Sequence, residues 1–179
     1  MRDLIVTQNI TVDSVIEAGD WFGPADGGPE VLEALRDQME RADAFLTGRV
    51  TFEQLRGFWP EQTDDESGVS AYLNQVHKYV VSSTLHDPQW EPTTILRTLD
   101  DVRRLKTTPG QDIVCTGSIT LTHELIAANL VDEYRLFTYP TVAGPGQHLF
   151  QDGVPRPLTL TTCRQFPSGV VLLTYRPTT

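Results

Sequence analysis

Asp43-Ala-Phe-Leu-Thr-Gly-Arg-Val-Thr-Phe-Glu53 is the stretch from which the fold can be worked out. Its apolar start is typical of a buried strand, which ends at Gly48 before Arg49, Thr51 and a predicted helix start. Glycine lets a ligand approach the backbone closely, arginine offers bidentate hydrogen bonds, and Thr51 adds a hydroxyl beside the free amides of a helix N-terminus. The junction therefore predicts a site for an anionic phosphate. The alternative is a tight turn followed by a surface arginine and a threonine cap.

Two further strand-like runs end in small residues of the same kind. The run that begins at Lys78 ends at Ser82 and Ser83, and the run 112–116 leads into Gly117 and Ser118. In an open α/β sheet, ligands bind outside the carboxyl ends of the strands. Three such ends favour one elongated ligand, and a dinucleotide has that shape. The alternative is that these residues only form turns.

The hydrophobic pattern predicts an α/β chain with a mostly parallel central sheet flanked by helices and an antiparallel C-terminal hairpin. A Gly- and Pro-rich loop at 19–29 carries Trp21 and Phe22, which we expect to serve as a lid or an interface. Strands are expected at 4–6, 44–47, 78–82, 93–96, 112–116, 133–139, 158–162 and 169–175, and helices at 31–42, 51–57, 69–76, 99–105 and 121–128.

Composition limits the class of protein. The 179 residues suit a single domain spanning 1–179, and a net charge of -10 argues against sequence-independent binding to nucleic acid or anionic membranes. Cys115 and Cys163 lie in strand-like runs, which predicts a buried free thiol for each and a reducing compartment. We find no signal peptide and no apolar run long enough to cross a membrane, so we expect a cytoplasmic protein. The four histidines have no metal-ligand spacing, and we expect no metal site.

Together these motifs resemble the dihydrofolate-reductase-like fold. The closer resemblance is to the reductase domain of the bifunctional deaminase-reductases of riboflavin biosynthesis and to its stand-alone bacterial relatives. The resemblance covers nearly the whole chain. It rests on Leu4-Ile-Val6 with Val12-Asp-Ser-Val-Ile16, on the stretch 43–53 with Trp59-Pro60, on Lys78-Tyr-Val-Val-Ser-Ser-Thr-Leu85, on Gly117-Ser-Ile-Thr-Leu121, and on Leu130-Val-Asp-Glu-Tyr-Arg-Leu136 with Pro140 and Gly144-Pro-Gly146.

The resemblance implies that NADPH lies across the strand ends. Phosphate groups would then be held by Gly48, Arg49 and Thr51, and the adenosine 2′-phosphate would lie near Ser82 and Ser83. The pyrophosphate would be bound by Gly117, Ser118, Ile119 and Thr120. The nicotinamide would lie close to Ile16. Many relatives carry arginine where this chain has Ser83, so NADH is also possible. Relatives commonly have Asp-Gly where this chain has Asp13-Ser14, which could alter the loop over the nicotinamide.

Hydride transfer is mostly the chemistry of the cofactor, to which the protein adds orientation and sometimes a proton. Asp26 and Glu30 lie near the position at which dihydrofolate reductases carry an acidic substrate anchor, which makes them the candidate catalytic acids. The alternative is a carboxylate that compensates the dipole of the first helix. Asn9 and Asp13 are candidate substrate contacts, although Asp13 could equally cap a turn.

The resemblance therefore implies a cytoplasmic, NADPH-dependent reductase of a small heterocyclic or sugar-linked substrate, similar to 5-amino-6-(5-phosphoribosylamino)uracil reductase. The chain contains no deaminase half with zinc-binding His and Cys spacing. The alternatives are folate or pterin reduction of the dihydrofolate reductase type and a non-catalytic nucleotide-binding module. A homodimer is also implied, and the apolar residues around Leu136 and Phe137 fit an interface.

Overall fold

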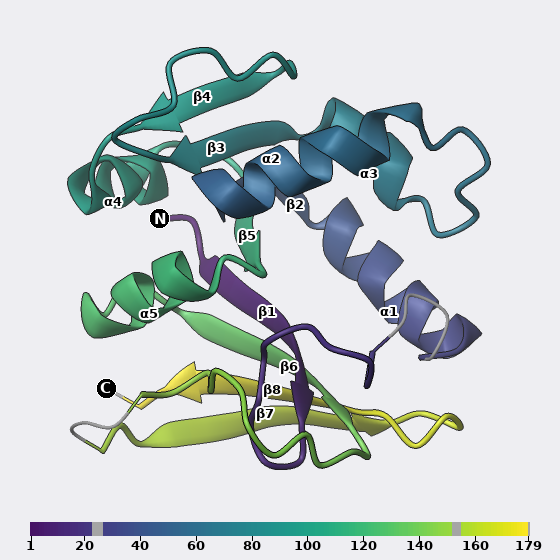
Figure 1. Cartoon of the computed structure of the whole chain (residues 1–179). Helices are drawn as coiled ribbons and strands as arrows, with labels where there is room; N and C mark the ends of the chain where they lie inside the picture. Colours follow the sequence, from purple (N-terminus) through teal and green to yellow (C-terminus); the bar gives the residue numbers. More distant parts are fainter. Residues whose placement is uncertain (23–26, 152–154, 179) are drawn as a thin grey trace.

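The computed structural model describes residues 1–22, 27–151 and 155–178. Its eight strands form one sheet in the order β4-β3-β2-β5-β1-β6-β8-β7 (Figure 1). The strands are β1 (Leu4–Thr11), β2 (Ala42–Gly48), β3 (His77–Val81), β4 (Thr93–Leu96), β5 (Asp112–Thr116), β6 (Glu133–Tyr139), β7 (Leu158–Gln165) and β8 (Val171–Pro177). The helices are α1 (Pro29–Glu40), α2 (Arg49–Phe58), α3 (Val69–Gln75), α4 (Leu99–Thr107) and α5 (Ile119–Ala127), with a short 3-10 helix at Trp59–Glu61.

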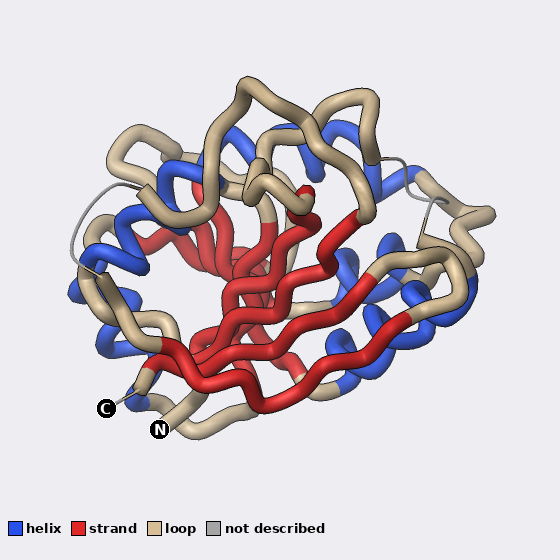
Figure 2. The backbone as a smooth tube through the Cα atoms, turned by 90° about the horizontal axis from the view of Figure 1, so that it is seen from below, coloured by secondary structure: helices blue, strands red, loops and turns tan. Residues whose placement is uncertain are grey.

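The first six strands are parallel to one another, β8 pairs antiparallel with β6, and β7 pairs antiparallel with β8. Figure 2 shows the strands side by side in one twisted sheet. Strand β1 lies between β5 and β6, where Val6 is in register with Cys115 on one side and with Tyr134 on the other. Seven of its eight residues are buried, as expected for a central strand covered on both faces. The carboxyl ends of β1, β2, β3 and β5 therefore meet at one edge of the sheet.

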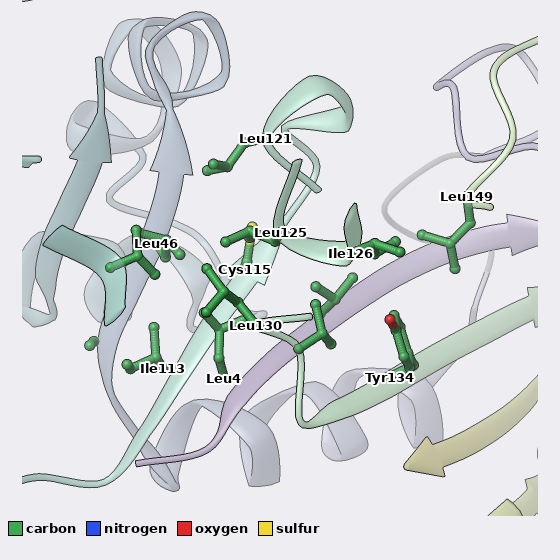
Figure 3. Close-up of a cluster of buried hydrophobic side chains, with 14 of the residues drawn as sticks. Leu4, Leu46, Ile113, Cys115, Leu121, Leu125, Ile126, Leu130, Tyr134 and Leu149 are labelled. Carbon is green, nitrogen blue, oxygen red and sulfur yellow. The ribbon is translucent and has the colours of Figure 1, made fainter. Parts of the chain in front are cut away.

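Helices cover both faces of this sheet. Alternate residues of β2 show the two layers: Phe45 packs with Phe52 of α2, whereas Leu46 on the opposite face belongs to the cluster that contains Leu121 and Leu125 of α5. Figure 3 shows this second cluster around Leu46, Cys115 and Leu125. Helices α1, α2 and α3 thus lie on one face, and α4 and α5 lie on the other.

The sequence-based elements are confirmed, with shifts at their ends. The first strand runs on to Thr11 because its polar residues are used inside the protein, and the buried Gln8 donates through Nε2 to the carbonyl of Gly117 at 2.9 Å. Helices α2 and α5 each begin two residues earlier than predicted, at Arg49 and Ile119. The helix starts therefore come directly after the small residues at the strand ends.

One prediction about exposure is wrong, and two pairs of apolar residues are less exposed than expected. Cys115 is buried, but Cys163 is exposed because it lies on β7 at the margin of the sheet. Trp21 and Phe22 are half-buried against the ring of Tyr139, at centroid separations of 5.7 and 5.4 Å, so these aromatics close a hydrophobic cluster. Leu136 and Phe137 are 6% and 2% exposed in β6 and form no exposed interface. Among the described residues, none of the helices has the length and apolar character needed to cross a membrane.

Candidate functional site

The turns that follow β2 and β5 are locked together at the carboxyl edge of the sheet. The hydroxyl of Ser118 accepts a hydrogen bond from the amide of Gly48 at 3.0 Å and shares another with the hydroxyl of Thr47, also at 3.0 Å. In return, the amide of Ser118 donates to Oγ1 of Thr51 at 3.1 Å. Because Thr51 Oγ1 accepts this bond, its own hydrogen can still be donated to a ligand. Segments 70 residues apart in the sequence thus form one rigid junction.

The backbone of this junction takes a conformation that depends on small residues. Gly117 and Ser118 both have positive φ angles, of 59° and 49°. A Cβ atom on Gly117 would lie 3.4 Å from Cγ2 of Thr51, which is a tight contact. A non-glycine residue in this left-handed region is strained, and such strain is concentrated at functional sites. Ser118 holds this conformation through the hydrogen bonds to Gly48 and Thr51.

Two helices start at the junction, side by side. The first backbone hydrogen bond of α5 runs from Thr122 to the carbonyl of Ser118 at 2.8 Å, so the amides of Ile119, Thr120 and Leu121 precede the helical ladder. The amides at the start of α2, from Arg49 onward, are in the same position relative to their helix. The paired N-termini add two positive dipole ends at one place, which is a favourable environment for phosphate groups.

Arg49 adds an exposed positive charge to this edge. Its side chain is 43% exposed and pairs with Glu53, one turn along α2, at 2.8 Å. An exposed pair of this kind contributes little to stability, so the guanidinium can reorient toward an anion at small cost. The predicted phosphate residues Gly48, Arg49 and Thr51 therefore lie at the same junction as Gly117, Ser118, Ile119 and Thr120.

The turn after β3 lies farther along the same edge. The hydroxyl of Ser82 is buried and accepts hydrogen bonds from the amides of Thr84 and Leu85 at 3.2 and 2.9 Å. Ser83 is exposed at the tip of the turn. Ser82 therefore shapes the turn, and Ser83 and Thr84 are exposed at its tip.

Asp13, a predicted substrate contact, joins two loops at the end of β1. Its carboxylate accepts hydrogen bonds from the hydroxyl of Thr11 at 2.5 Å and from the amides of Ala143 and Gly144 at 3.1 and 2.8 Å. The Thr11 hydrogen bond, followed by the two backbone amides, lowers the pKa of Asp13 to about 2. Asp13 therefore caps a turn, which was one of the two predicted roles. That turn belongs to the loop 141–146, which is distant from Asp13 in the sequence.

Ile16 is held by the same pair of loops. Its amide donates to the carbonyl of Gln147 at 2.9 Å, and its side chain is 6% exposed. The preceding Val15 forms an antiparallel bridge with His148. A pocket of about 380 Å³ lies between the loops, lined by Val15, Glu17, Ala18, Gly19, Asp20, Trp21, Val142, Ala143 and Pro145. This pocket is acidic, and none of these lining residues is cationic.

Residues 2–172 match the RibD C-terminal domain family. The chain belongs to the RibD C-terminal domain family. It is 32% identical to the Bacillus subtilis protein YyaP, whose function is uncharacterised, over 97% of this chain and 94% of that protein.

Solved structures show the fold of this RibD C-terminal domain more broadly. A Shewanella sp. PV-4 protein assigned to riboflavin biosynthesis superimposes with a TM-score of 0.73 and 18% identity over 99% of both chains. Dihydrofolate reductase from Enterococcus faecalis, solved with NADP(H), superimposes with a TM-score of 0.66 and 16% identity over 99% of this chain and 97% of that one. The fold is therefore dihydrofolate-reductase-like, as the sequence predicted.

Asn9 and Glu30, two of the remaining predicted residues of this RibD C-terminal domain, lie on the face covered by α1. Asn9 is half-buried and in register with Phe137, which packs against Val31 and Ala34 of α1. Glu30 is half-buried in the first turn of that helix. Asp26 lies outside the described residues. Asn9 and Glu30 therefore share one face, and their roles stay predictions.

Sequence reasoning missed two residues of this site. Gln8 lies on the face of β1 opposite to Asn9 and holds the Gly117 carbonyl inside the protein by a hydrogen bond. Its sequence signal was an amide side chain in the middle of an apolar strand. Arg97 follows β4, and its Nη1 donates to the carbonyls of Ser82 and Leu85, each at 2.8 Å. A positive charge thus lies beside Ser83, but it comes from the neighbouring strand, which no local motif indicates.

Proposed function

We propose that this RibD C-terminal domain is an NAD(P)H-dependent reductase. The observation that carries the proposal is the junction in which Ser118 joins Gly48 to Thr51 and sets the N-termini of α2 and α5 side by side. The residues present fit a dinucleotide, because amides and dipoles suit a pyrophosphate and a separate cationic turn lies along the same edge. Such a cofactor, when bound, supplies a hydride.

Each part of the site has a role under this proposal. Gly48, Arg49, Thr51 and the amides of 117–120 bind the pyrophosphate, and Gln8 keeps the Gly117 carbonyl turned away from it. Ser82 and Ser83 lie beside the adenosine. Ile16 closes over the nicotinamide, held in place by the 141–149 loop. Asn9 orients the substrate, and Glu30 or Asp26 holds a proton for the reduced product.

The proposal includes a preference for NADPH. The chain has Ser83 where many relatives have arginine, but Arg97 supplies a guanidinium at the same turn. Within the described residues the Arg97 guanidinium donates through Nη1, so Nη2 and Nε can pair with a phosphate. We therefore propose NADPH as the cofactor, with NADH as a weaker ligand.

The proposed substrate is a small heterocyclic or sugar-linked compound that accepts hydride at a C=N or C=O group. The resemblance to riboflavin-pathway enzymes favours 5-amino-6-(5-phosphoribosylamino)uracil, whose phosphate needs a cation outside the acidic pocket of Glu17 and Asp20. Folate reduction is the second candidate, favoured by the half-buried Glu30 in the first turn of α1. The expectation of a cytoplasmic location is part of this proposal.

The decisive test is titration with NADPH and NADH, followed through quenching of tryptophan fluorescence. Arg49→Ala should weaken both nucleotides by about 1.5–3 kcal/mol, the cost of losing a charged hydrogen bond. Arg97→Met should weaken NADPH by a similar amount and leave NADH unchanged, because only NADPH carries a 2′-phosphate. Arg41→Ala is the matched control, since Arg41 is exposed beside the C-terminus of α1 at the opposite edge of the sheet.

The outcomes separate the candidate functions. Failure of the wild type to bind either nucleotide would overturn the reductase proposal. Binding followed by loss of NADPH absorbance with the aminopyrimidine or with dihydrofolate would identify the substrate class. Tight binding without turnover of either compound would favour the non-catalytic nucleotide-binding module.

A further inference from the structure

Three polar side chains share the face of the sheet that α1 and α2 flank. Strands β5 and β1 lie between β2, which packs against α2, and β6, which packs against α1. Because successive residues of a strand point to opposite faces, Thr7 and Asn9 of β1 and Thr116 of β5 point away from the cluster beneath α5. Thr7 and Thr116 are in register with each other. We call these three residues the polar strip.

The polar strip can hydrogen-bond a ligand. Thr7 is 4% exposed, whereas Asn9 and Thr116 are half-buried, so the strip is reached from solvent. Within the described part of the chain, the side chains of these three residues make no hydrogen bond. Hydroxyl and amide groups both donate and accept, and none of the three carries a charge. The polar strip therefore suits the C=O and N–H groups along the edge of a neutral ring.

Positive charge is missing from the two segments that border the proposed nicotinamide position. Residues 3–35, which form β1, the loop after it and the first half of α1, contain seven carboxylates and neither lysine nor arginine. Residues 136–155, which form the end of β6 and the loop that holds Ile16, contain no lysine or arginine either. A phosphate bound between these segments would need a cation from another element.

The two arginines of α2 are engaged elsewhere. Arg49 pairs with Glu53 and, under the proposed function, binds the phosphates of the cofactor. Arg56 donates through Nη1 to the carbonyl of Pro88, in the segment before β4, at 2.8 Å. Neither guanidinium is therefore left to bind a phosphate of the substrate.

The arginine of α1 is surrounded by carboxylates. Arg36 donates through Nε to the carbonyl of Ser67 at 3.2 Å and through Nη2 to the carbonyl of Glu66. The segment 61–68, which these bonds attach to α1, carries four acidic residues, namely Glu61, Asp64, Asp65 and Glu66. An anion that approached Arg36 would be repelled by this segment.

The start of α1 is also unsuited to an anion. Pro29 has no N–H group to donate, and Glu30 places a carboxylate in the first turn, where it already compensates the helix dipole. Glu17 and Asp20 line the pocket of about 380 Å³ beside Ile16. Carboxylates thus border the polar strip on the side of the loop and on the side of α1.

We propose that the substrate of this site is an unphosphorylated heterocycle that is neutral or positively charged. The inference rests on the proposed function and selects among its substrates by charge. The phosphate of 5-amino-6-(5-phosphoribosylamino)uracil and the glutamate carboxylates of dihydrofolate would each lie among carboxylates without a cation to bind them. The same ring systems without these anionic groups keep the bond that accepts hydride and the edge that the polar strip binds.

The test compares two matched pairs of ligands. The first pair is 5-amino-6-(ribosylamino)uracil and its 5′-phosphate, and the second is 7,8-dihydropterin and dihydrofolate. Isothermal titration calorimetry of the protein saturated with NADP+ measures binding without turnover. In at least one pair, the member without the anionic group should bind roughly tenfold tighter or more, and NADPH should reduce it faster.

A charge variant tests whether the local carboxylates cause the discrimination. Asp20→Lys places a cation in the pocket beside Ile16 and should tighten binding of the phosphorylated uracil roughly tenfold, with little change for the unphosphorylated one. Asp37→Lys is the matched control, because it changes the net charge equally. Asp37 is exposed in a groove of about 490 Å³ between α1 and β8, so this variant should change neither affinity.

The outcomes separate this inference from the proposed function. A protein that binds neither NADPH nor NADH would overturn the proposed function itself. Normal NADPH binding together with equal or tighter binding of the phosphorylated uracil and of dihydrofolate would overturn this inference alone. Normal NADPH binding without binding of either uncharged ligand would overturn it as well, because the polar strip would then not hold such a ring.

Discussion

At the scale of single residues, Gly117 and Gly57 offer a matched test of what a glycine does in this fold. Gly117 has φ 59° at the candidate site, and its Cβ would meet Thr51, whereas Gly57 lies in α2 with no atom within 4 Å of its Cβ position. Gly117→Ala should lower the free energy of unfolding by about 1–2 kcal/mol, the cost of the left-handed conformation. Gly57→Ala should raise it by about 0.5–1 kcal/mol, because alanine favours the helix.

Urea denaturation of both variants measures these changes, and nucleotide titration adds a second readout. Gly117→Ala should weaken NADPH binding because its Cβ displaces Thr51, whereas Gly57→Ala should leave binding unchanged. Equal effects of the two substitutions on unfolding would show that the turn at Gly117 carries no conformational constraint.

Individual residues also show how far the sequence predicts the site. Gly48, Arg49, Gly117 and Ser118 were predicted as neighbours, because each follows a strand and parallel strands end at the same edge. The bonds that join them were not predicted, since the contact of Ser118 with Gly48 depends on β2 and β5 being adjacent in the sheet. Arg97 was missed for the same reason, because its contact with the Ser82 turn crosses from β4 to β3.

At the scale of elements, Lys78 joins β3 to α3 and to the segment before β4. It is fully buried, and its ammonium donates to the carbonyls of Leu73, Val76 and Glu91 at 2.7, 3.1 and 3.4 Å, 4.6 Å from the ring centroid of Trp90. Burial lowers the pKa of Lys78 to about 8, from 10.5 in an exposed lysine. Between these values the unfolded chain binds more protons than the folded protein, so this residue makes stability rise with pH.

The expected result is a difference between the wild type and Lys78→Met. From pH 7 to pH 9.5, the free energy of unfolding of the wild type should rise by about 2 kcal/mol relative to the variant. Urea denaturation of both proteins at several pH values measures this difference. The other titrating groups contribute equally to the free energy of unfolding of the two proteins, so their contributions cancel. A difference that stays constant with pH would show that Lys78 keeps an ordinary pKa in the folded protein.

The elements themselves were largely predictable, because period and composition are local properties. The run 112–116 is strand β5 with both ends as predicted, since it is apolar and bounded by Gly110 and Gly117. The end of β1 was not predictable, because Thr7 and Gln8 look solvent-exposed in the sequence but are buried, and Gln8 is bonded to the Gly117 carbonyl, which is distant in the sequence. Cys163 was placed wrongly because an edge strand and a central strand have similar compositions.

At the scale of the whole molecule, the candidate site joins parts that are distant in the sequence. The junction of Gly48, Thr51 and Ser118 connects β2 and β5 in the sheet, α2 on one face and α5 on the other. A ligand held by this junction contacts both helical layers. Binding should therefore stabilise the cooperative unit as a whole, because a ligand that binds only the folded state shifts the unfolding equilibrium by mass action.

NADPH at about 100 times its dissociation constant should add about 2.7 kcal/mol to the free energy of unfolding. For a chain of this length, that gain should raise the melting temperature by roughly 5–10 °C. Differential scanning calorimetry with Arg49→Ala at the same NADPH concentration is the comparison, since this variant should unfold at a similar temperature without ligand and gain less from it. A single transition whose melting temperature rises with NADPH would show that the site is coupled to the entire fold. Separate transitions, of which only one responds to NADPH, would show instead that the nucleotide stabilises a part of the sheet.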